Sequence, residues 1–445
     1  MSDELLAIAD GIVARARAGE EVEAYVERAR STKARARKGE VETLEQATAA
    51  GVGVRVVVDG KQGFAYVGSL DPDAIASALD DARDNAEHGT ADDANGLAVP
   101  DGVAPAKESV VDEALLALTA QEKVDLALAL EAALLAADPR VESASLAQFS
   151  DSFGEKAVVT TTGIRITDRY TGCGVTAEAL AVDGAERHEA YAFDSNRRLA
   201  ALDVEGTGRL AGERAAALIG SRKPESRRTT VVFDQWMVAN LMGIIGSTLT
   251  GSTVLKGRSL FADRVGDTVA HPSFTLVDDP TDPESMASTY DGEGLASRRT
   301  PLIQDGVLQG FLHASWSARK SKSASTASAT RGYSSTPSVS ARGLQLRPGT
   351  LSEADLLASV GDAVFVQSMS GLHSGVNPVS GDFSVGMTGR VVRGGALGEP
   401  IREATIASTI QRMLLDVVAI GSELRWIGGT GVPMVAIEGV SLSGV

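Results

Sequence analysis

The sequence is poor in the residue types that most often build disulfides and metal sites. Cys173 is the single cysteine among 445 residues, so no internal disulfide can form, and we expect a reducing compartment, the cytoplasm. Five histidines are present, and none has a second histidine three to five residues away. This spacing excludes the paired imidazoles on one helix that a catalytic zinc usually needs.

Long apolar runs are also missing. The longest apolar stretches, such as Leu241 to Ile245, are far shorter than the roughly 20 residues of a membrane-spanning helix. The N-terminus has neither the basic segment nor the apolar segment of a signal peptide. We therefore expect a soluble protein of the cytoplasm that has no membrane partner.

Common nucleophile and phosphate motifs are absent or incomplete. No G-x-S-x-G sequence occurs, and Ser317 to Lys320 matches S-x-x-K at a level expected by chance. Residues 246–253 have the glycine spacing of a phosphate-binding loop but lack its lysine. His188-Glu189 begins like a zinc-hydrolase motif, yet Ala192 and Phe193 stand where the second histidine would be. Structural roles are favoured for all three segments.

Charge and composition narrow the class of protein further. The 42 lysines and arginines against 59 aspartates and glutamates give a net charge of −17, which repels phosphate backbones and disfavours a nucleic-acid partner. Hydrophobic residues make up 43% of the chain and charged residues 23%, which are globular proportions. A chain of this length is expected to form two or three domains.

The first half contains signals for both helices and antiparallel strands. Periodicity predicts helices over residues 4–18 and 206–219, Asp71-Pro72-Asp73 predicts a helix start at an acidic turn, and Thr119 with Glu122 predicts a capping box. Residues 51–58 and 63–68 flank Asp59-Gly60 and predict a hairpin. Residues 141–194 predict an antiparallel meander, and the polar stretch 89–108 a linker.

The second half is richer in short strands. A strand over residues 229–233 and an apolar helix over 235–249 are followed by many short β-prone runs, with one further good helix near residues 403–420. The serine-rich segment 315–340 is predicted to be an exposed loop or lid. The predicted fold class is α+β: an N-terminal α/β region with an antiparallel sheet, and a C-terminal β-rich domain with few helices. The predicted domains are 1–110, 111–224 and 225–445.

An ordered set of short motifs in the second half resembles one known family. Trp236 lies on a helix that follows a strand, and the motifs after it are Leu255–Leu260, Val277–Pro280, Asp291–Gly294, Pro301–Leu312, Ser317–Arg319, Arg331–Tyr333, Gly375–Gly386 and Ala404–Ala407. Together they resemble the TldD/PmbA family, in particular its PmbA or TldE branch. The N-terminal part from Val22 to Gly68 is similar as well.

The resemblance implies amide-bond hydrolysis in the cytoplasm by two homologous subunits. Only the TldD branch carries a metal-binding HExxxH helix and a cysteine near its C-terminus that completes a zinc site. Here the matching segment is Met242 to Ser247, in which Met242, Gly243 and Ser247 are degenerate metal-helix positions, and no cysteine lies in residues 421–445. We expect no cofactor in this chain and zinc in the partner subunit.

The working hypothesis is a metal-free TldE-type subunit that pairs with a TldD-type HExxxH homologue and walls a cavity for unfolded or modified peptide. No catalytic residue is assigned to this chain. Family placement makes the candidate cavity residues Asp291, Glu293, Arg319, Arg331, Asn377 and Asp382. The family's acidic turn usually reads Asp-Asp-Glu-Gly, and Gly292 replaces its second aspartate. Two alternatives stay open: a homodimeric peptide-binding or scaffold protein, and the partner subunit of a natural-product amide hydrolase.

Overall fold

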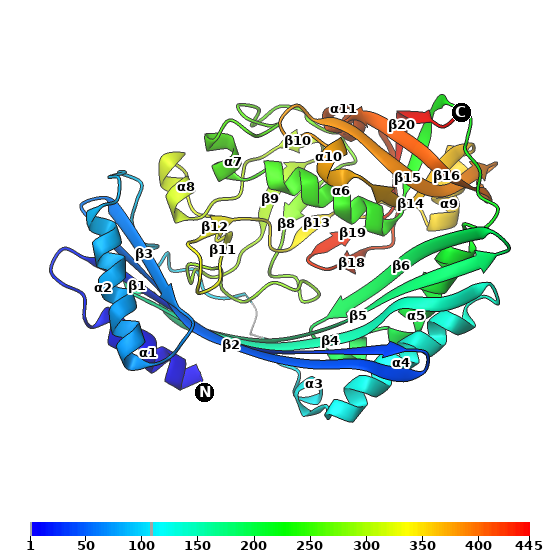
Figure 1. Ribbon diagram of the computed structural model, residues 1–445. Coiled ribbons are helices and arrows are strands. Elements are labelled where there is room, and N and C mark those ends of the chain that lie inside the picture. Colours follow the sequence, from blue (N-terminus) through cyan, green and yellow to red (C-terminus); the bar gives the residue numbers. More distant parts are fainter. Residues whose placement is uncertain (1, 107–109) are drawn as a thin grey trace.

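The computed structural model describes residues 2–106 and 110–445. Its N-terminal part contains α1 (Ser2–Val13), β1 (Glu21–Arg37), β2 (Glu40–Val58), β3 (Lys61–Val67), α2 (Pro72–Glu87), α3 (Glu113–Ala117), α4 (Ala120–Ala136), β4 (Val141–Thr160), β5 (Arg165–Asp183), β6 (Glu186–Asn196), a 3-10 turn (Leu199–Ala201) and α5 (Val204–Ala216). The six strands form one antiparallel sheet in the order β3-β2-β1-β4-β5-β6. This long sheet curves beneath the C-terminal half, and α4 and α5 lie on its outer face (Figure 1).

The C-terminal half begins with β7 (Arg227–Phe233), α6 (Gln235–Thr248) and α7 (Gly251–Leu255). It continues with β8 (Leu276–Asp278), β9 (Thr300–Gln304), β10 (Val307–Leu308), α8 (Ser315–Lys320), β11 (Ala329–Thr330), β12 (Ser338–Val339), β13 (Leu344–Leu346), α9 (Glu353–Val360), β14 (Ala363–Ser370) and α10 (Leu372–Gly375). The last elements are β15 (Asp382–Arg393), β16 (Ala396–Thr409), α11 (Ile410–Leu415), β17 (Val417–Ile420), β18 (Arg425–Ile427), β19 (Thr430–Val432) and β20 (Val435–Ser443).

Two larger sheets organise that half. One has the order β16-β15-β14-β7-β20-β17, the other the order β10-β9-β8-β13-β19-β18, and β11 and β12 form a small hairpin. Helix α6 contacts strands of both larger sheets. It is buried between them because Trp236, Met237, Val238, Leu241 and Ile245 are all at most 5% exposed. The predicted α+β fold class is confirmed.

Local signals located several elements well. Asp59 and Gly60 have φ of 49° and 73°, the left-handed pair that a tight hairpin between β2 and β3 requires. Asp71 caps α2 by accepting hydrogen bonds from the backbone N–H groups of Asp73 and Ala74, and Thr119 forms the predicted capping box with Glu122. The strands at residues 141–194 form the predicted meander.

The polar stretch 89–108 has neither helix nor strand in its described residues, which end at 106, as expected for a linker. Residues 107 and 108 of that prediction lie outside the described residues. Leu97 and Ala98 are nevertheless buried, so the linker packs against the rest of the protein.

Two predictions for the second half were wrong. The helix predicted near residues 403–420 is strand β16 as far as Thr409, where Ile406 pairs with Val385 and Leu442 of neighbouring strands, and only α11 is helical. Tertiary strand pairing there overrides the local helical pattern. Helix α9 was missed, although Ser352 caps it by accepting the backbone N–H of Asp355.

The segment 315–340 is an exposed loop only in part: residues 319–324, 334–336 and 338 are exposed, and the others are buried or half-buried. It forms α8 and the β11–β12 hairpin, and Ser317, Ser328 and Ala329 in it are at most 1% exposed. Tyr333 lies against the long sheet, where a Cβ added to Gly51 would come within 2.4 Å of its ring. The serines that suggested exposure satisfy their hydroxyls internally, for example Ser317 with His313 and Ala314.

The predicted boundary near residue 110 remains a prediction, and the long sheet runs through it because β1 pairs with β4. Among the described residues, no helix is long and apolar enough to cross a membrane.

Close packing of α4 on α5 generates a stability prediction. The glycines at 206–212 lie in α5, and a Cβ added to Gly208 would be 2.4 Å from the carbonyl oxygen of Leu130 in α4. We expect Gly208→Ala to lower the free energy of unfolding by about 1–3 kcal/mol, since a backbone carbonyl cannot move aside as a side chain can. Denaturant titration measures this.

Gly11→Ala is the matched control. Gly11 is also helical, and a Cβ added there meets nothing within 4 Å. This change should be neutral or stabilising by up to about 1 kcal/mol. Equal effects of the two substitutions would contradict the close helix contact.

Candidate functional site

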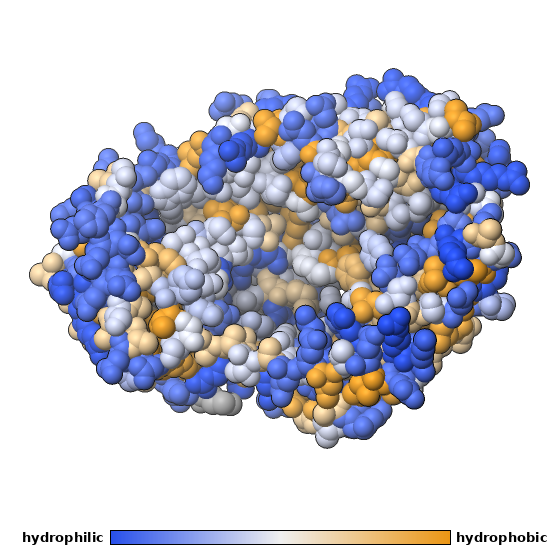
Figure 2. Space-filling model, in the orientation of Figure 1, coloured by the Kyte–Doolittle hydropathy of each residue, from blue (hydrophilic) through white to orange (hydrophobic). Residues whose placement is uncertain are grey.

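Helix α6 presents one free face to a pocket. Asp234 starts the helix by accepting the backbone N–H of Met237 at 2.8 Å. Met242 points into the buried side, whereas Gly243 and Ser247 are exposed. These last two residues help to line a pocket of about 320 Å³ whose other lining residues are Gly246, Thr250, Ser252, Thr253, Val339, Ser340, Ala341, Arg342, Leu344, Gly429 and Thr430. The surface is hollowed between the C-terminal half and the long sheet, and α6 borders this hollow (Figures 1 and 2).

The α6 pocket is lined by hydroxyls, backbone and small residues. Arg342 is its single ionisable lining residue, and its guanidinium is already committed, donating to the Ser297 hydroxyl and to the carbonyls of Ala327, Ser288 and Tyr290 at 2.8–3.2 Å. Burial lowers the pKa of Arg342, against the opposing charges of neighbouring aspartates. The pocket can therefore hydrogen-bond a peptide, but it offers no imidazole, carboxylate or thiolate.

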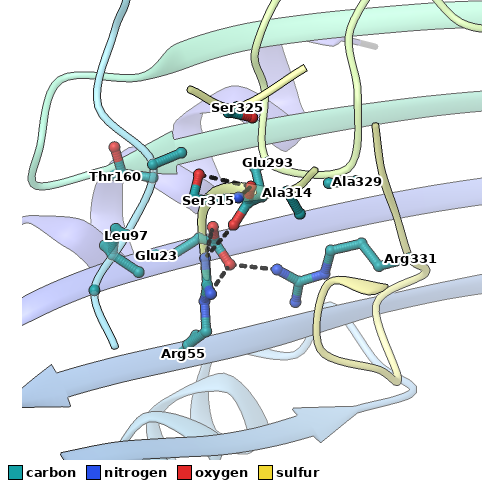
Figure 3. Close-up of polar contacts among 12 residues, drawn as sticks. Glu23, Arg55, Leu97, Thr160, Glu293, Ala314, Ser315, Ser325, Ala329 and Arg331 are labelled. Carbon is teal, nitrogen blue, oxygen red and sulfur yellow. Dashed lines mark hydrogen bonds and ion pairs between the residues drawn. The ribbon is translucent and has the colours of Figure 1, made fainter. Parts of the chain in front are cut away.

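A buried network of charges joins the long sheet to the C-terminal half (Figure 3). Arg55 of β2 lies 2.8 Å from Glu23 of β1 through Nη2 and Oε2, and 3.6 Å from Glu293 Oε1. Arg331 also pairs with Glu23. Glu293 accepts hydrogen bonds from the backbone N–H and hydroxyl of Ser315 at 2.9 and 2.8 Å. The four charged side chains are at most 4% exposed.

The arginines determine the ionisation of Glu23. Burial by itself raises the pKa of this carboxyl, but the charges of Arg55 and Arg331 and their hydrogen bonds outweigh burial and hold its pKa below the usual value. Glu23 is therefore a carboxylate at neutral pH. Its negative charge allows both guanidinium groups to remain buried.

Asp291 lies beside this network and shapes the acidic turn. It accepts backbone N–H groups of Glu293 and Leu295 through Oδ1, at 2.9 and 3.0 Å, and of Ala329 through Oδ2 at 3.1 Å. Burial, followed by the charge of Glu293, raises its pKa to about 6. Asp291 thus ties the turn to β11.

The structure separates the six candidate cavity residues into three places. Asp291, Glu293 and Arg331 belong to the buried network or border it. Arg319, on α8, donates to the carbonyls of Ala94, Gly96 and Leu97 at 2.6–3.2 Å and so fastens the linker. Asn377 and Asp382 are exposed at the two ends of the turn that leads into β15, whose first residue is Asp382, and the backbone N–H of Asn377 donates to the carbonyl of Asp382. That the six line a cavity stays a prediction.

Sequence reasoning missed Glu23 and Arg55. Each stands between apolar residues in a strand, Glu23 between Val22 and Ala24, and Arg55 between Val54 and Val56. Strand alternation places each charge on the face opposite its apolar neighbours, where an exposed side chain is expected, so the local pattern gave no signal that Glu23 and Arg55 are buried. The partner could not be found this way either, because Arg331 is 308 residues away from Glu23.

The fold and the site define a two-part α+β protein whose curved antiparallel sheet is fastened to a β-rich half carrying the α6 pocket. Models of PmbA/TldA metallopeptidase domain 1, central domain and C-terminal domain match residues 22–86, 113–219 and 226–444. The chain belongs to the TldD/PmbA family.

Named relatives and solved structures agree with this family assignment. The chain is 26% identical to "Metalloprotease PmbA" of Escherichia coli O157:H7, over 87% of this chain and 84% of that one. It is also 26% identical to "Metalloprotease TldD homolog" of Haemophilus influenzae, over 88% and 86%. Its fold resembles the crystal structure of TldE from Thermococcus kodakarensis, with a TM-score of 0.88, 21% identity and 99% coverage of both chains.

The family name implies a metal, and the residues of this chain do not fit one. Helix α6 contains no histidine, cysteine, aspartate or glutamate, so Met242, Gly243 and Ser247, the positions predicted to correspond to a metal helix, supply no imidazole and no carboxylate. Within residues 2–106 and 110–445, no group of three or more His, Cys, Asp or Glu side chains could hold a metal ion. No step of hydrolysis is assigned to a metal held by this chain.

The buried network yields a stability prediction. Glu23→Gln leaves two buried guanidinium groups without their shared carboxylate, so we expect a loss of about 3–5 kcal/mol in the free energy of unfolding. Glu399→Gln is the control, since Glu399 and its partner Arg393 are 66% and 67% exposed, solvent screens their attraction, and the change should leave the free energy of unfolding nearly unaltered. Urea titration at neutral pH compares them. A cost below about 1 kcal/mol for Glu23→Gln would show that the network does not fasten the two halves.

The raised pKa of Asp291 predicts a pH effect. Between its unfolded value, near 4, and about 6, folded Asp291 holds a proton that the unfolded chain has released, so its contribution to stability falls as pH rises through this window. The amide of an Asp291→Asn variant cannot titrate. We expect the wild type to lose stability relative to this variant between pH 4 and 6, by on the order of 1.4 kcal/mol per pKa unit. Parallel profiles of unfolding free energy against pH would contradict the shift.

Proposed function

We propose that this chain is the metal-free, TldE-type subunit of a heterodimeric TldD/TldE zinc metallopeptidase of the cytoplasm. The complex would hydrolyse amide bonds of unfolded peptides, and a TldD-type partner would supply the zinc, its ligands and the general base. Bound zinc would activate water and polarise the scissile carbonyl in the partner. This chain would stabilise the partner and form part of the wall that holds the peptide.

The side chains that α6 presents to the pocket support this proposal. At the pocket, the side chain of Gly243 is only a hydrogen atom and that of Ser247 carries a hydroxyl. Met242 is buried among apolar residues. The Ser247 hydroxyl donates to the carbonyl of Ile244 at 2.7 Å, which leaves its oxygen able to accept one more hydrogen bond. A helix of this kind can border a substrate but cannot activate water.

The pocket's shape and chemistry suit the wall of a peptide site. A volume of about 320 Å³ accommodates a few groups of an extended chain and excludes a folded domain. Gly243 allows a peptide backbone to approach the helix closely, because it is exposed and carries no Cβ. The Ser252 hydroxyl can serve as a donor or acceptor for peptide groups, and the Thr253 hydroxyl, which donates to the carbonyl of Ser247, as an acceptor, without selecting a charged side chain.

The test compares the chain alone with the chain co-purified with a TldD-type homologue from the same genome. We expect the isolated chain to contain far less than one zinc per molecule by elemental analysis and not to hydrolyse an unstructured peptide. The complex should contain zinc and hydrolyse the peptide until a chelator is added. One zinc per isolated chain, or chelator-resistant hydrolysis by it, would refute the proposal; a stable homodimer that binds peptide and refuses the partner would favour the scaffold alternative.

The same assay includes a variant that fills the pocket. A Cβ added to Gly243 meets nothing within 4 Å, so Gly243→Leu should fold normally and project a side chain into the peptide's space. We expect kcat/KM of the complex to fall at least tenfold, while Gly310→Leu, at a glycine with equally open surroundings, leaves it unchanged. Equal activities would show that the α6 pocket does not border the peptide.

A further inference from the structure

A second pocket lies between the last strand of the long sheet and the C-terminal half. Its volume is about 190 Å³, and its lining residues are Glu189, Ala190, Tyr191, Arg214, Leu218, Gln367, Ser368, Met369 and Thr388. They belong to β6, to α5 and the turn after it, and to β14 and β15. Strand β6 is the edge of the long sheet that faces the C-terminal half (Figure 1). We call this site the β6 pocket, and the proposed function leaves it without a role.

Two side chains of β6 line the β6 pocket from the inner face of the sheet. Glu189, Tyr191 and Phe193 alternate along the strand and so share one face. That face meets the C-terminal half, because the ring centres of Phe193 and Tyr191 lie 4.9 and 5.9 Å from that of Trp236. Tyr191 is nevertheless 41% exposed, so stacking on Trp236 leaves part of its ring open.

The single cation that lines the β6 pocket is already paired. Arg214 of α5 forms an ion pair with Asp234, the residue that caps α6, and its guanidinium lies 4.1 Å from the centre of the Trp236 ring. Arg425 lies over the same ring at 5.7 Å, but it does not line the pocket. A ligand in the pocket therefore meets Arg214 and Asp234 as a neutral pair.

Glu189 carries the lining charge that stays uncompensated. Its carboxylate accepts the Ser145 hydroxyl at 3.3 Å and forms no ion pair among the described residues. Beside it, burial raises the pKa of Tyr191, so this side chain remains a neutral phenol. Glu178 faces Tyr191 from β5, on the same face of the sheet, and adds a second carboxylate nearby. Carboxylates next to an open aromatic ring favour a cation with an apolar stem.

The β6 pocket lies along the same face of α6 as the α6 pocket. Trp236, which stacks on Tyr191, and Gly243, which lines the α6 pocket, are seven residues apart and so share a face of the helix. At about 1.5 Å per residue, they are about 10 Å apart along its axis. An extended peptide rises about 3.3 Å per residue, so a chain held at Gly243 reaches the β6 pocket within a few residues.

We propose that the β6 pocket is a specificity site that takes a lysine or arginine side chain of the peptide. The inference rests on the proposed function for the peptide itself. The stem of the basic side chain lies against Tyr191 and Met369, and its charged end meets Glu189. Gln367 Oε1 has no hydrogen-bond partner within residues 2–106 and 110–445, so rotation of this amide brings a further acceptor to the bound cation.

Paired peptides test the charge preference. One unstructured peptide carries a single lysine, its match carries norleucine at that position, and the position moves along the sequence through the set. With the isolated chain, we expect at least one lysine peptide to have a Kd at least fivefold below that of its match, by fluorescence anisotropy. Glu189→Gln should remove this difference. Glu438→Gln, at an exposed glutamate that lines neither pocket, should keep it.

The complex with the TldD-type homologue separates the two proposals. Its kcat/KM should show the same lysine preference, lost in Glu189→Gln. If it hydrolyses peptide but neither kcat/KM nor Kd distinguishes lysine from norleucine, the specificity site is wrong and the proposed function stands. If no complex hydrolyses peptide while the isolated chain keeps a preference that depends on Glu189, the proposed function is wrong and the site stands. If neither hydrolysis nor a preference is seen, both are wrong.

A lysine preference that persists in Glu189→Gln would also overturn the site. Circular dichroism of each variant checks folding. Salt provides a second readout, since a preference that depends on charge should shrink between 0.1 and 1 M NaCl, where the Debye length falls from about 10 to about 3 Å. A preference that salt leaves unchanged would contradict recognition by the Glu189 carboxylate.

Discussion

Glu23 and Arg55 face the C-terminal half from neighbouring strands of the long sheet, where Arg331 and Glu293 meet them from loops far along the chain. Charges removed from water are tolerated only when each has a partner in good geometry. The two halves therefore have few relative positions in which each of the four groups has an oppositely charged partner. Arg319 adds a second connection by donating hydrogen bonds to three carbonyl groups of the linker. This constraint positions the C-terminal half over the inner face of the sheet.

The position of α6 follows from that arrangement. Its apolar side is buried between the two C-terminal sheets, and its free side, with Gly243 and Ser247, borders a pocket whose walls come from β12, β13 and β19 and the turns beside them. Packing, rather than ligation, explains why the helix is so apolar. Gly243 and Ser247 are exposed, so other side chains at these two positions would require little change in the surrounding fold. The chemistry of this site therefore depends on a few side chains rather than on the fold that carries them.

Local rules identified the elements whose causes are local. The capping box of α4, the Asp71 cap of α2 and the Asp59-Gly60 turn depend on residues within four positions of one another, so they could be read directly. The same reasoning was wrong over 403–420, where Ile406 is held in β16 by two strands distant in sequence. Over 315–340 it was right only for the exposed parts of the segment, because serine suggests solvent exposure unless its hydrogen-bond partners are known.

By itself, the sequence determined the α+β class, the family and the lack of metal-ligand side chains on α6, since these depend on residue identity, periodicity and the order of motifs. Only the tertiary structure decided which candidate residues meet. Asp291, Glu293 and Arg331 gather at the sheet, whereas Asn377 and Asp382 lie in a separate exposed turn. The physical reason is that an ion pair between groups some 300 residues apart is created by the docking of two halves, and no local pattern in either strand encodes its partner.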